Sequence, residues 1–242
     1  MVGENESIDI PVPSPVGVLL FHGLFGTPNE LHVLGGEIAR AGYRVRIPLL
    51  PGRGADWDEL GRLAWRDVAR FARAQYEELA CEHEQVVLGG LSAGGTLALD
   101  SALAHPPAAL LLYAVPLTLR PRGAWLAPYA WRLIPTWPMR IEGPVVRERV
   151  PLRAVAELVG AMGRVRSRLG EIRAPALVAH AKDDPLVPFS SAQRLKADLG
   201  GPVELATFEG SEHALTFGPG RDRLAALTLA FLRAHVPLEG NA

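Results

Sequence analysis

Short apolar runs alternate with longer segments of helical spacing along almost the whole 242-residue chain. Most runs are apolar throughout, as burial on both faces of a sheet requires, so we predict that they form strands. Alternation of strands and helices is typical of α/β proteins with a largely parallel sheet, and we expect one domain over residues 1–242. The predicted strands are residues 16–21, 43–47, 86–91, 109–113, 176–181 and 203–208, with a further edge strand at 8–12. The predicted helices are residues 28–41, 64–80, 94–105, 190–199 and 222–234.

Residues 116–173 interrupt this alternation, because they separate two predicted strands by far more than one helix. A loop of this length without structure of its own is uncommon in a compact domain, so we expect helices around residues 125–134 and 152–163. An insertion above the carboxyl ends of parallel strands usually covers a site. We therefore predict that residues 116–173 form a small helical cap within the domain.

The stretch from Gly89 to Gly95 reads GGLSAGG and follows a predicted strand directly. Its G-x-S-x-G pattern permits a sharp strand-to-helix turn, because bulky side chains two residues before and after the serine would collide. A helical pattern follows, as a nucleophile on such a turn requires. We predict that Ser92 is a catalytic nucleophile. The alternative is a glycine-rich turn that only packs a helix against the sheet.

A serine hydroxyl is a poor nucleophile at neutral pH, so it needs a base to accept its proton and an acid to orient that base. Asp183 and Asp184 follow one predicted strand, and His213 follows the next, which places them at carboxyl ends of the sheet. The resulting order of Ser, Asp and His matches the class of hydrolase that carries its nucleophile on such a strand-to-helix turn. Only His213 and His235 lie after the acid. His235 ends a helix whose apolar spacing accounts for its position, so we predict that His213 is the base.

A second glycine motif, HGLFG at residues 22–26, leads from the end of a predicted strand toward a helix. Acyl transfer develops negative charge on the carbonyl oxygen, and preorganised N–H groups must stabilise that charge. We predict that the backbone N–H groups of Leu24 and Ala93 form this oxyanion hole, reinforced by the helix N-terminus next to each. A plain tight turn is the alternative reading of this motif.

Four motifs stand out together: HGLFG from His22, GLSAGG from Gly90, DPLVP from Asp184 and SEH ending at His213. In combination they resemble the α/β-hydrolase superfamily over nearly the whole chain. Within that superfamily, the small size and compact insertion are similar to bacterial carboxylesterases and monoacylglycerol lipases.

The resemblance implies an α/β-hydrolase fold, in which helices flank a mostly parallel central sheet. It also implies hydrolysis of carboxylic esters by Ser92, His213 and Asp184, with no metal and no organic cofactor. Asp184 matches better than Asp183, because the family spacing is Asp-x-x-Val-Pro. Ala93 stands where methionine or glutamine is common in such enzymes, and this keeps the N–H group while enlarging the pocket.

Large apolar side chains dominate residues 116–173, which hold three of the five tryptophans. One account is that these side chains only fasten the insertion to the domain. A second account, for Trp125, Trp131 and Leu119, is that they bind substrate in a tunnel for an acyl chain. Burial there is worth about 0.8 kcal/mol per CH₂ and favours medium chains over acetate. A third account is a surface that touches a lipid interface, because arginines alternate with the tryptophans. These arginines are Arg120, Arg122, Arg132 and Arg140.

The charge balance excludes some partners. A net charge of −1 provides no global field that would attract nucleic acid, so we expect a small-molecule ester as the partner, without nucleic acid. No run approaches about 18 apolar residues, so we expect no stable membrane insertion. The N-terminus lacks the basic and apolar regions of a secretory signal, which favours a cytoplasmic protein. Cys81 has no partner cysteine, and we predict that it is a small core residue. The pattern carries no signal for oligomeric state.

Other functions use the same residues. An acyltransferase, a C–C hydrolase or a perhydrolase would fit as well, because fold and triad do not fix the acceptor or the bond. A binding protein that kept the fold and lost turnover is the alternative outside the enzymes. The complete set of Ser92, Asp184 and His213 argues against it, so we predict a carboxylic ester hydrolase that acts on short to medium acyl chains, monoacylglycerols among them.

Overall fold

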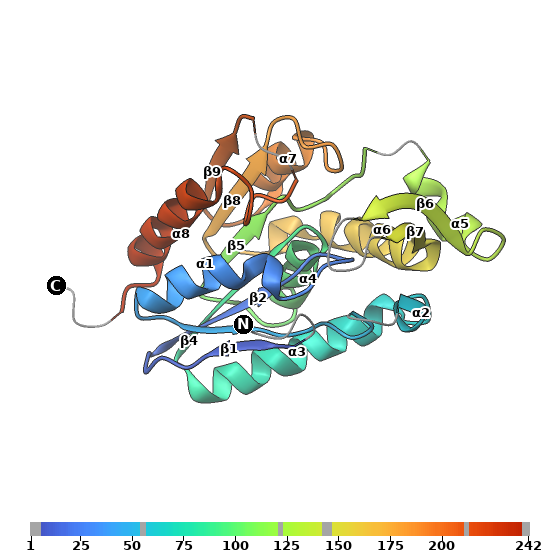
Figure 1. Ribbon diagram of the computed structural model, residues 1–242. Coiled ribbons are helices and arrows are strands. Elements are labelled where there is room, and N and C mark those ends of the chain that lie inside the picture. The colour runs from blue at the N-terminus through green and yellow to red at the C-terminus, as the bar shows by residue number, and fades with distance from the viewer. Residues whose placement is uncertain (1–5, 54–56, 121–122, 142–146, 211–212, 239–242) are drawn as a thin grey trace.

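The computed structural model describes residues 6–53, 57–120, 123–141, 147–210 and 213–238. Its centre is a seven-stranded sheet in the order β1-β3-β2-β4-β5-β8-β9 (Figure 1). All neighbouring strands run parallel except β1, which pairs antiparallel with β3 at one edge. The strands are β1 (Ile8–Ile10), β2 (Val16–Phe21), β3 (Arg44–Ile47), β4 (Gln85–Leu91), β5 (Ala109–Tyr113), β8 (Ala176–Ala181) and β9 (Val203–Phe208).

The predicted strands are confirmed. Four of them, at residues 16–21, 109–113, 176–181 and 203–208, coincide with β2, β5, β8 and β9. Every residue of β2, β5 and β8 is buried, which explains why their sequences, apart from His180 in β8, are apolar rather than alternating. The edge strand expected at residues 8–12 is the shorter β1.

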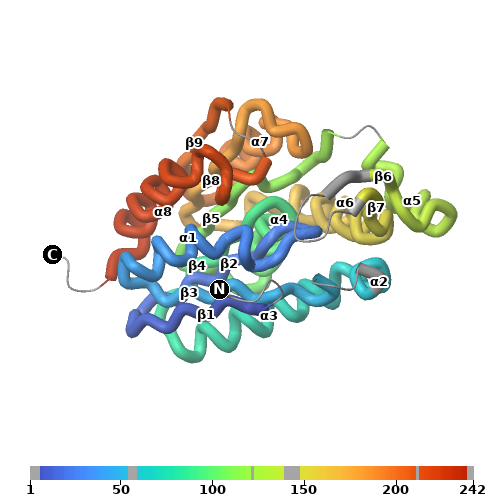
Figure 2. The backbone as a smooth tube through the Cα atoms, in the orientation of Figure 1, coloured from blue at the N-terminus to red at the C-terminus, as the bar shows by residue number. Residues whose placement is uncertain are grey.

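Helices cover both faces of the sheet. Helices α1 and α8 share one apolar cluster with the sheet, and α3, α4 and α7 share the other. Figure 2 shows α1 beside α8, which come from opposite ends of the chain and are in contact. The bounds of these helices are α1 (Asn29–Arg40), α3 (Trp65–Glu82), α4 (Ala93–Ala102), α7 (Ser190–Asp198) and α8 (Arg221–His235). All five predicted helices are confirmed, and the fold class is α/β.

The connections of β2 and β4 bring two loops together. Strand β2 lies between β3 and β4, so the chain leaves β2 toward one side of the sheet and later returns on its other side. Such a reversal of strand order opens a crevice at the carboxyl ends of the strands, where open α/β sheets bind ligands. The loop after β2 and the turn after β4 both stand at this position.

The segment between β5 and β8 contains a two-stranded sheet and further helices. Its elements are α5 (Ala127–Ala130), preceded by a 3₁₀ turn, then β6 (Thr136–Ile141), β7 (Arg147–Pro151) and α6 (Leu152–Arg166). The expected helix at 152–163 is confirmed as α6, whereas only short helical turns form within 125–134. We did not predict the β6–β7 hairpin, because a proline inside β6 argues against a strand. The short α2 (Trp57–Leu60) was also not predicted and contacts β7.

The prediction for Cys81 is wrong, because its side chain is exposed. The buried side of α3 includes Val68, Ala72 and Leu79. Cys81 lies two residues beyond Leu79, and two residues along a helix turn the side chain to the opposite side. The helical period of α3 therefore places this cysteine toward solvent.

Candidate active site

Ser92 occupies the turn between β4 and α4 with a φ of 55° and a ψ of −122°. This conformation is rare for a residue with a side chain and stores strain that the surrounding structure must support. Part of the support is a hydrogen bond of 2.8 Å from the Ser92 N–H to the carbonyl oxygen of Tyr113, the last residue of β5. A nucleophile displayed on a strained strand-to-helix turn has this geometry.

The glycines around Ser92 are required by close backbone contacts. A Cβ on Gly94 would lie 2.0 Å from the carbonyl oxygen of Phe21, and one on Gly90 would lie 2.5 Å from the carbonyl carbon of Gly94. Neither distance is possible for real atoms. The glycines therefore let the start of α4 pass directly over the ends of β2 and β4.

Asp184 is fully buried just after β8, whereas its neighbour Asp183 is exposed. One carboxylate oxygen, Oδ1, accepts hydrogen bonds of 2.8 Å from the N–H groups of Leu186 and Val187. The other, Oδ2, lies 2.7 Å from Nδ1 of His213. Burial alone would raise the pKa of Asp184, but these hydrogen bonds and the charge interaction with His213 outweigh it and lower the pKa below its ordinary value.

His213 follows β9 and orients its ring by the contact with Asp184. An ionised Asp184 accepts a hydrogen bond from Nδ1–H, so Nε2 of the neutral ring is left to accept a proton from a nucleophile. His235, the other histidine late in the chain, instead lies 2.9 Å from the carboxylate of Glu204 through its Nε2. Of the two, only His213 is joined to the buried acid.

The three predicted catalytic residues stand at the same edge of the sheet. Ser92 follows β4, Asp184 follows β8 and His213 follows β9, and these parallel strands lie in the order β4-β5-β8-β9. Within the described residues, the Ser92 hydroxyl makes no hydrogen bond to His213. Such contacts are often longer in enzymes without substrate and shorten when the substrate binds. Ser211 and Glu212, which precede the histidine in the sequence motif, lie outside the described residues.

The loop of residues 23–26 is a tight turn closed by a 3.3 Å hydrogen bond from the Gly26 N–H to the Gly23 carbonyl oxygen. In the described part of the chain, the Leu24 N–H donates to no protein acceptor. The Ala93 N–H is in the first residue of α4, ahead of the intrahelical hydrogen bonds. Both groups are therefore able to donate to a bound oxyanion.

His22 is buried and holds this loop in place. Its Nε2 accepts a 3.1 Å hydrogen bond from the Leu50 N–H, so the ring proton is on Nδ1, which lies 3.0 Å from the Gly23 carbonyl oxygen. Burial, together with the charge of Arg53, lowers the pKa of His22 to about 3. A neutral imidazole with a hydrogen bond at each ring nitrogen supports the loop and does not act as a base.

Sequence reasoning missed two charged residues next to this loop. Glu30, in the first turn of α1, accepts a 2.8 Å hydrogen bond from the Gly23 N–H. Arg53, in the loop after β3, donates from Nε to the Leu24 carbonyl oxygen at 3.1 Å. A glutamate in the helix turn directly after a glycine motif was the available signal for the first, and nothing local marked the second.

The predicted substrate-binding residues have different environments. Leu119 packs against the main apolar cluster that holds α3 and α4. Trp131 packs on a small cluster formed with α6, and the guanidinium groups of Arg132 and Arg153 lie over its ring. Trp125 is 67% exposed. The contact of these three side chains with substrate stays a prediction. Of the arginines predicted at a lipid interface, Arg122 and the side chain of Arg140 lie outside what the structure describes.

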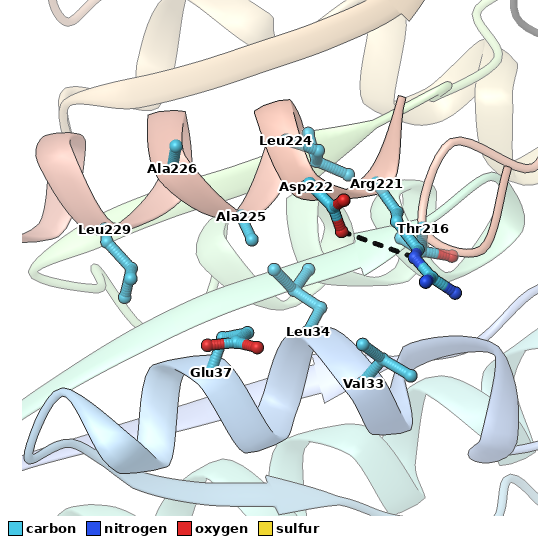
Figure 3. Close-up of a pocket in the computed structure, with 10 residues that line it drawn as sticks. All are labelled: Val33, Leu34, Glu37, Thr216, Arg221, Asp222, Leu224, Ala225, Ala226 and Leu229. Atoms are coloured by element: carbon cyan, nitrogen blue, oxygen red, sulfur yellow. Dashed lines mark hydrogen bonds and ion pairs between the residues drawn. The ribbon is translucent and has the colours of Figure 1, made fainter. Parts of the chain in front are cut away.

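Among the described residues, no group of three or more His, Cys, Asp and Glu side chains is placed to hold a metal ion. A groove of about 330 Å³ lies between α1 and α8, with Leu34, Glu37 and Thr216 in its lining (Figure 3). None of the predicted catalytic residues lines this groove. Across the described ranges, no helix is long and apolar enough to span a bilayer.

Known proteins resemble this chain over most of its length. The sequence model of a family described as serine aminopeptidase, S33 (Hydrolase_4) matches residues 15–220. A thermostable monoacylglycerol lipase of Bacillus sp. (strain H-257) is 27% identical over 229 residues, covering 91% of this chain and 92% of the lipase. A carboxylesterase of Bacillus subtilis (strain 168) is 25% identical, covering 85% of this chain and 87% of the esterase. A solved structure from work on the metagenome-derived lipolytic enzymes LipS and LipT superposes with a TM-score of 0.87 and 24% identity, covering 97% of this chain and 100% of its own.

Proposed function

We propose that this chain, which belongs to the Hydrolase_4 family (serine aminopeptidase, S33) of α/β-hydrolases, cleaves carboxylic esters through an acyl-enzyme on Ser92. One observation carries the proposal: the buried carboxylate of Asp184 lies 2.7 Å from Nδ1 of His213, at the sheet edge where the strained Ser92 turn also lies. An acid–imidazole pair beside a displayed serine is the apparatus of acyl transfer. The esterase and lipase relatives support an ester rather than an amide as the bond cleaved.

In the first half of the reaction, the Ser92 hydroxyl oxygen attacks the ester carbonyl carbon while its proton passes to Nε2 of His213. The Asp184 carboxylate holds Nδ1–H and stabilises the imidazolium. The N–H groups of Leu24 and Ala93 donate to the oxyanion of the tetrahedral intermediate. The carbon–oxygen bond to the alcohol then breaks, and the alcohol leaves with the proton from His213.

In the second half, water replaces the alcohol. His213 removes a proton from the water as its oxygen attacks the acyl carbon. The second tetrahedral intermediate collapses, the bond to the Ser92 oxygen breaks, and His213 returns the proton to that oxygen. A carboxylic acid is released and the enzyme is restored. No step requires a group that these residues and water do not supply.

We propose further that residues 116–173 act as a cap over this site and that the acyl chain binds against its apolar side chains, Trp125, Trp131 and Leu119 among them. Burial of each CH₂ is worth about 0.8 kcal/mol, which is about fourfold in kcat/KM if the whole gain is expressed in the transition state. Medium-chain esters, including monoacylglycerols, should therefore react faster than acetates. The ratio of kcat/KM for p-nitrophenyl octanoate and p-nitrophenyl acetate measures this preference, and a ratio below one would contradict it.

The central proposal is tested with a fluorophosphonate that reacts with activated serines. The wild-type protein should gain the mass of one adduct, and Ser92→Ala should gain none under the same conditions. Ser101→Ala, which removes a buried serine hydroxyl in α4 away from the turn, should label like the wild type. A wild-type protein that stays unlabelled and hydrolyses no p-nitrophenyl ester would instead support the alternative of a binding protein.

A further inference from the structure

We propose that Glu30 and Arg53 are positioning residues that hold the loop of residues 23–26 so that the Leu24 N–H faces the reacting carbonyl oxygen. This inference rests on the proposed function, in which that N–H stabilises the oxyanion. Neither side chain touches the reacting atoms in this assignment. Both act through the backbone of the loop.

Three consecutive peptide groups of the loop are held by three side chains. Glu30 accepts the Gly23 N–H at 2.8 Å, the His22 ring donates to the Gly23 carbonyl oxygen at 3.0 Å, and Arg53 donates to the Leu24 carbonyl oxygen at 3.1 Å. The side chains come from α1, from the end of β2 and from the loop after β3. A loop held at three successive peptides from three directions has little freedom to rotate.

Among the described residues, the Leu24 N–H is the group that this arrangement leaves without an acceptor. It belongs to the peptide whose carbonyl oxygen, that of Gly23, is already bonded to His22 and to the Gly26 N–H. In a planar trans peptide the N–H points opposite to the C=O, so holding the oxygen on one side directs the N–H to the other. Removing a contact on either side would let this peptide turn away from the oxyanion.

The loop is shaped around the Glu30 carboxylate. A Cβ on Gly26 would lie 2.1 Å from the Cδ atom of Glu30, and one on Gly23 would lie 3.1 Å from its Oε2. The carboxylate therefore occupies the space that a side chain at residue 26 would fill. Its place in the first turn of α1 is also favourable, because the helix N-terminus stabilises negative charge.

Arg53 is fixed on the other side of the loop. Its guanidinium also donates to the Pro51 carbonyl oxygen at 2.6 Å, so one side chain joins its own loop to the Leu24 carbonyl. Burial lowers the pKa of Arg53 to about 10, which still leaves it charged at neutral pH. Hydrogen bonds from a charged donor are stronger than neutral ones.

The Glu30 side chain also interacts with the proposed base, His213. Burial raises the pKa of Glu30, and the Gly23 N–H together with the nearby His213 partly offsets the rise. Among the described residues, the Gly23 N–H donates to this carboxylate, and His213 lies near enough to interact with its charge. When Glu30 is ionised, its charge attracts the imidazolium that forms on His213 during acyl transfer.

Two substitutions separate the hydrogen bond from the charge. Glu30→Gln keeps an oxygen that accepts the Gly23 N–H but removes the negative charge, whereas Glu30→Ala removes both. We expect Glu30→Ala to lower kcat for p-nitrophenyl butyrate about 10- to 100-fold with KM changed less than about threefold, because an oxyanion donor is typically worth about 10²–10³ in kcat. Glu30→Gln should keep most of kcat, because its amide oxygen still accepts the Gly23 N–H.

Matched controls come from the same parts of the chain. Glu37→Gln alters another glutamate of α1, which pairs with Arg40 beside the groove in Figure 3, and should leave kcat unchanged. Arg53→Ala should lower kcat like Glu30→Ala, and Arg62→Ala, at an exposed arginine nearby, should not. Gly26→Ala displaces the carboxylate without removing it and should also lower kcat. In the double variant with Glu30→Ala, the loss of kcat should be smaller than the two single losses combined, because both changes act on the same contact.

Thermal unfolding of each variant separates positioning from stability. A loss of kcat in protein that is fully folded at the assay temperature supports the proposal. Equal kcat for Glu30→Ala and wild type would overturn it, as would a loss that follows only the unfolded fraction. If wild type and Glu30→Ala react with the fluorophosphonate at the same rate, this inference fails and the proposed function stands. If Ser92 of the wild type does not react at all, the proposed function itself fails.

Discussion

At the scale of single residues, the candidate site depends on groups held in unfavourable surroundings. Ser92 has a positive φ that few residues with side chains adopt, and Asp184 is a fully buried carboxyl. Each is supported by specific partners: the Tyr113 carbonyl for the Ser92 N–H, and two N–H groups and an imidazole for the carboxylate. Removing one partner of such a group leaves the other without compensation, so single substitutions here should have large effects.

Asp184→Asn should lower kcat for ester hydrolysis by about 10³- to 10⁴-fold, because an amide in place of the carboxylate no longer holds Nδ1–H or stabilises the imidazolium. The adjacent Asp183→Asn is the matched control, since Asp183 is exposed. Its kcat should stay close to the wild-type value. Steady-state kinetics on p-nitrophenyl butyrate decides the assignment, and a larger loss for Asp183→Asn would reverse it.

The lowered pKa of Asp184 also predicts a pH dependence of stability. A carboxyl whose pKa is lower in the folded chain stabilises the fold above its unfolded pKa, about 3.9 for aspartate, and this stabilisation is lost as the pH falls through the folded pKa. Urea unfolding of wild type and Asp184→Asn should therefore show a difference in the free energy of unfolding that is largest near neutral pH and narrows in acid. A difference that widens as the pH falls would contradict the assigned direction.

At the scale of elements, side chains from one helix complete the ends of another. The N-cap of α3 is Ala64, whose side chain has no oxygen to accept a backbone N–H. Glu157 of α6 takes this role instead and accepts the Trp65 N–H at 2.8 Å. The indole N–H of Trp65 also donates to Asp100 of α4 at 3.2 Å. Thus α6, which belongs to residues 116–173, is joined to α3 by Glu157, and α3 is joined in turn to α4 by Trp65.

Glu157→Ala should lower the free energy of unfolding by about 1 kcal/mol, the usual effect of losing an N-cap acceptor. For a chain of this size, that corresponds to a fall in Tm of about 2–4 °C. Glu148→Ala, at an exposed glutamate of β7, is the control and should unfold within about 1 °C of the wild type. Calorimetry measures both Tm values. Equal values for the two variants would show that the hydrogen bond from the Trp65 N–H to Glu157 does not stabilise the fold.

At the scale of the whole molecule, exposed apolar side chains gather in one segment. Leu133 is 87%, Tyr129 79% and Trp125 67% exposed, and all three lie between β5 and β6. Arg132 and Arg149, from the same segment, are also exposed. Apolar side chains among cations suit the interface of an anionic lipid layer, where aromatic rings enter the boundary and cations meet the headgroups.

The double variant Trp125→Gln, Leu133→Gln should bind less to vesicles that contain anionic lipid, because less apolar area enters the interface. Co-sedimentation with vesicles of phosphatidylcholine and phosphatidylglycerol measures the bound fraction. Val33→Gln, at an exposed apolar side chain of α1, is the control and should bind like the wild type. Equal binding of all three proteins would assign these side chains to another role.

Much of the fold follows from local patterns. Mainly apolar runs identified β2, β5 and β8, since a strand buried on both faces has no polar side to present. The β6–β7 hairpin was missed, because Pro138 inside a short run argues against a strand. Cys81 was misplaced because composition was used where the helical period of α3 decides exposure. The motif around Ser92 could be recognised in the sequence, because a nucleophile on a sharp turn requires glycines at fixed positions around it.

The sequence by itself determined the order of strands and helices and the residue types for acyl transfer, because both are written in spacings of a few residues. Only the tertiary structure decided that His213 bonds to the buried Asp184 while Asp183 faces solvent, and that Glu30 and Arg53 meet the same loop. These contacts join segments that are distant along the chain. They depend on how parallel strands and their loops pack, and no local spacing encodes a distance between two side chains from different elements.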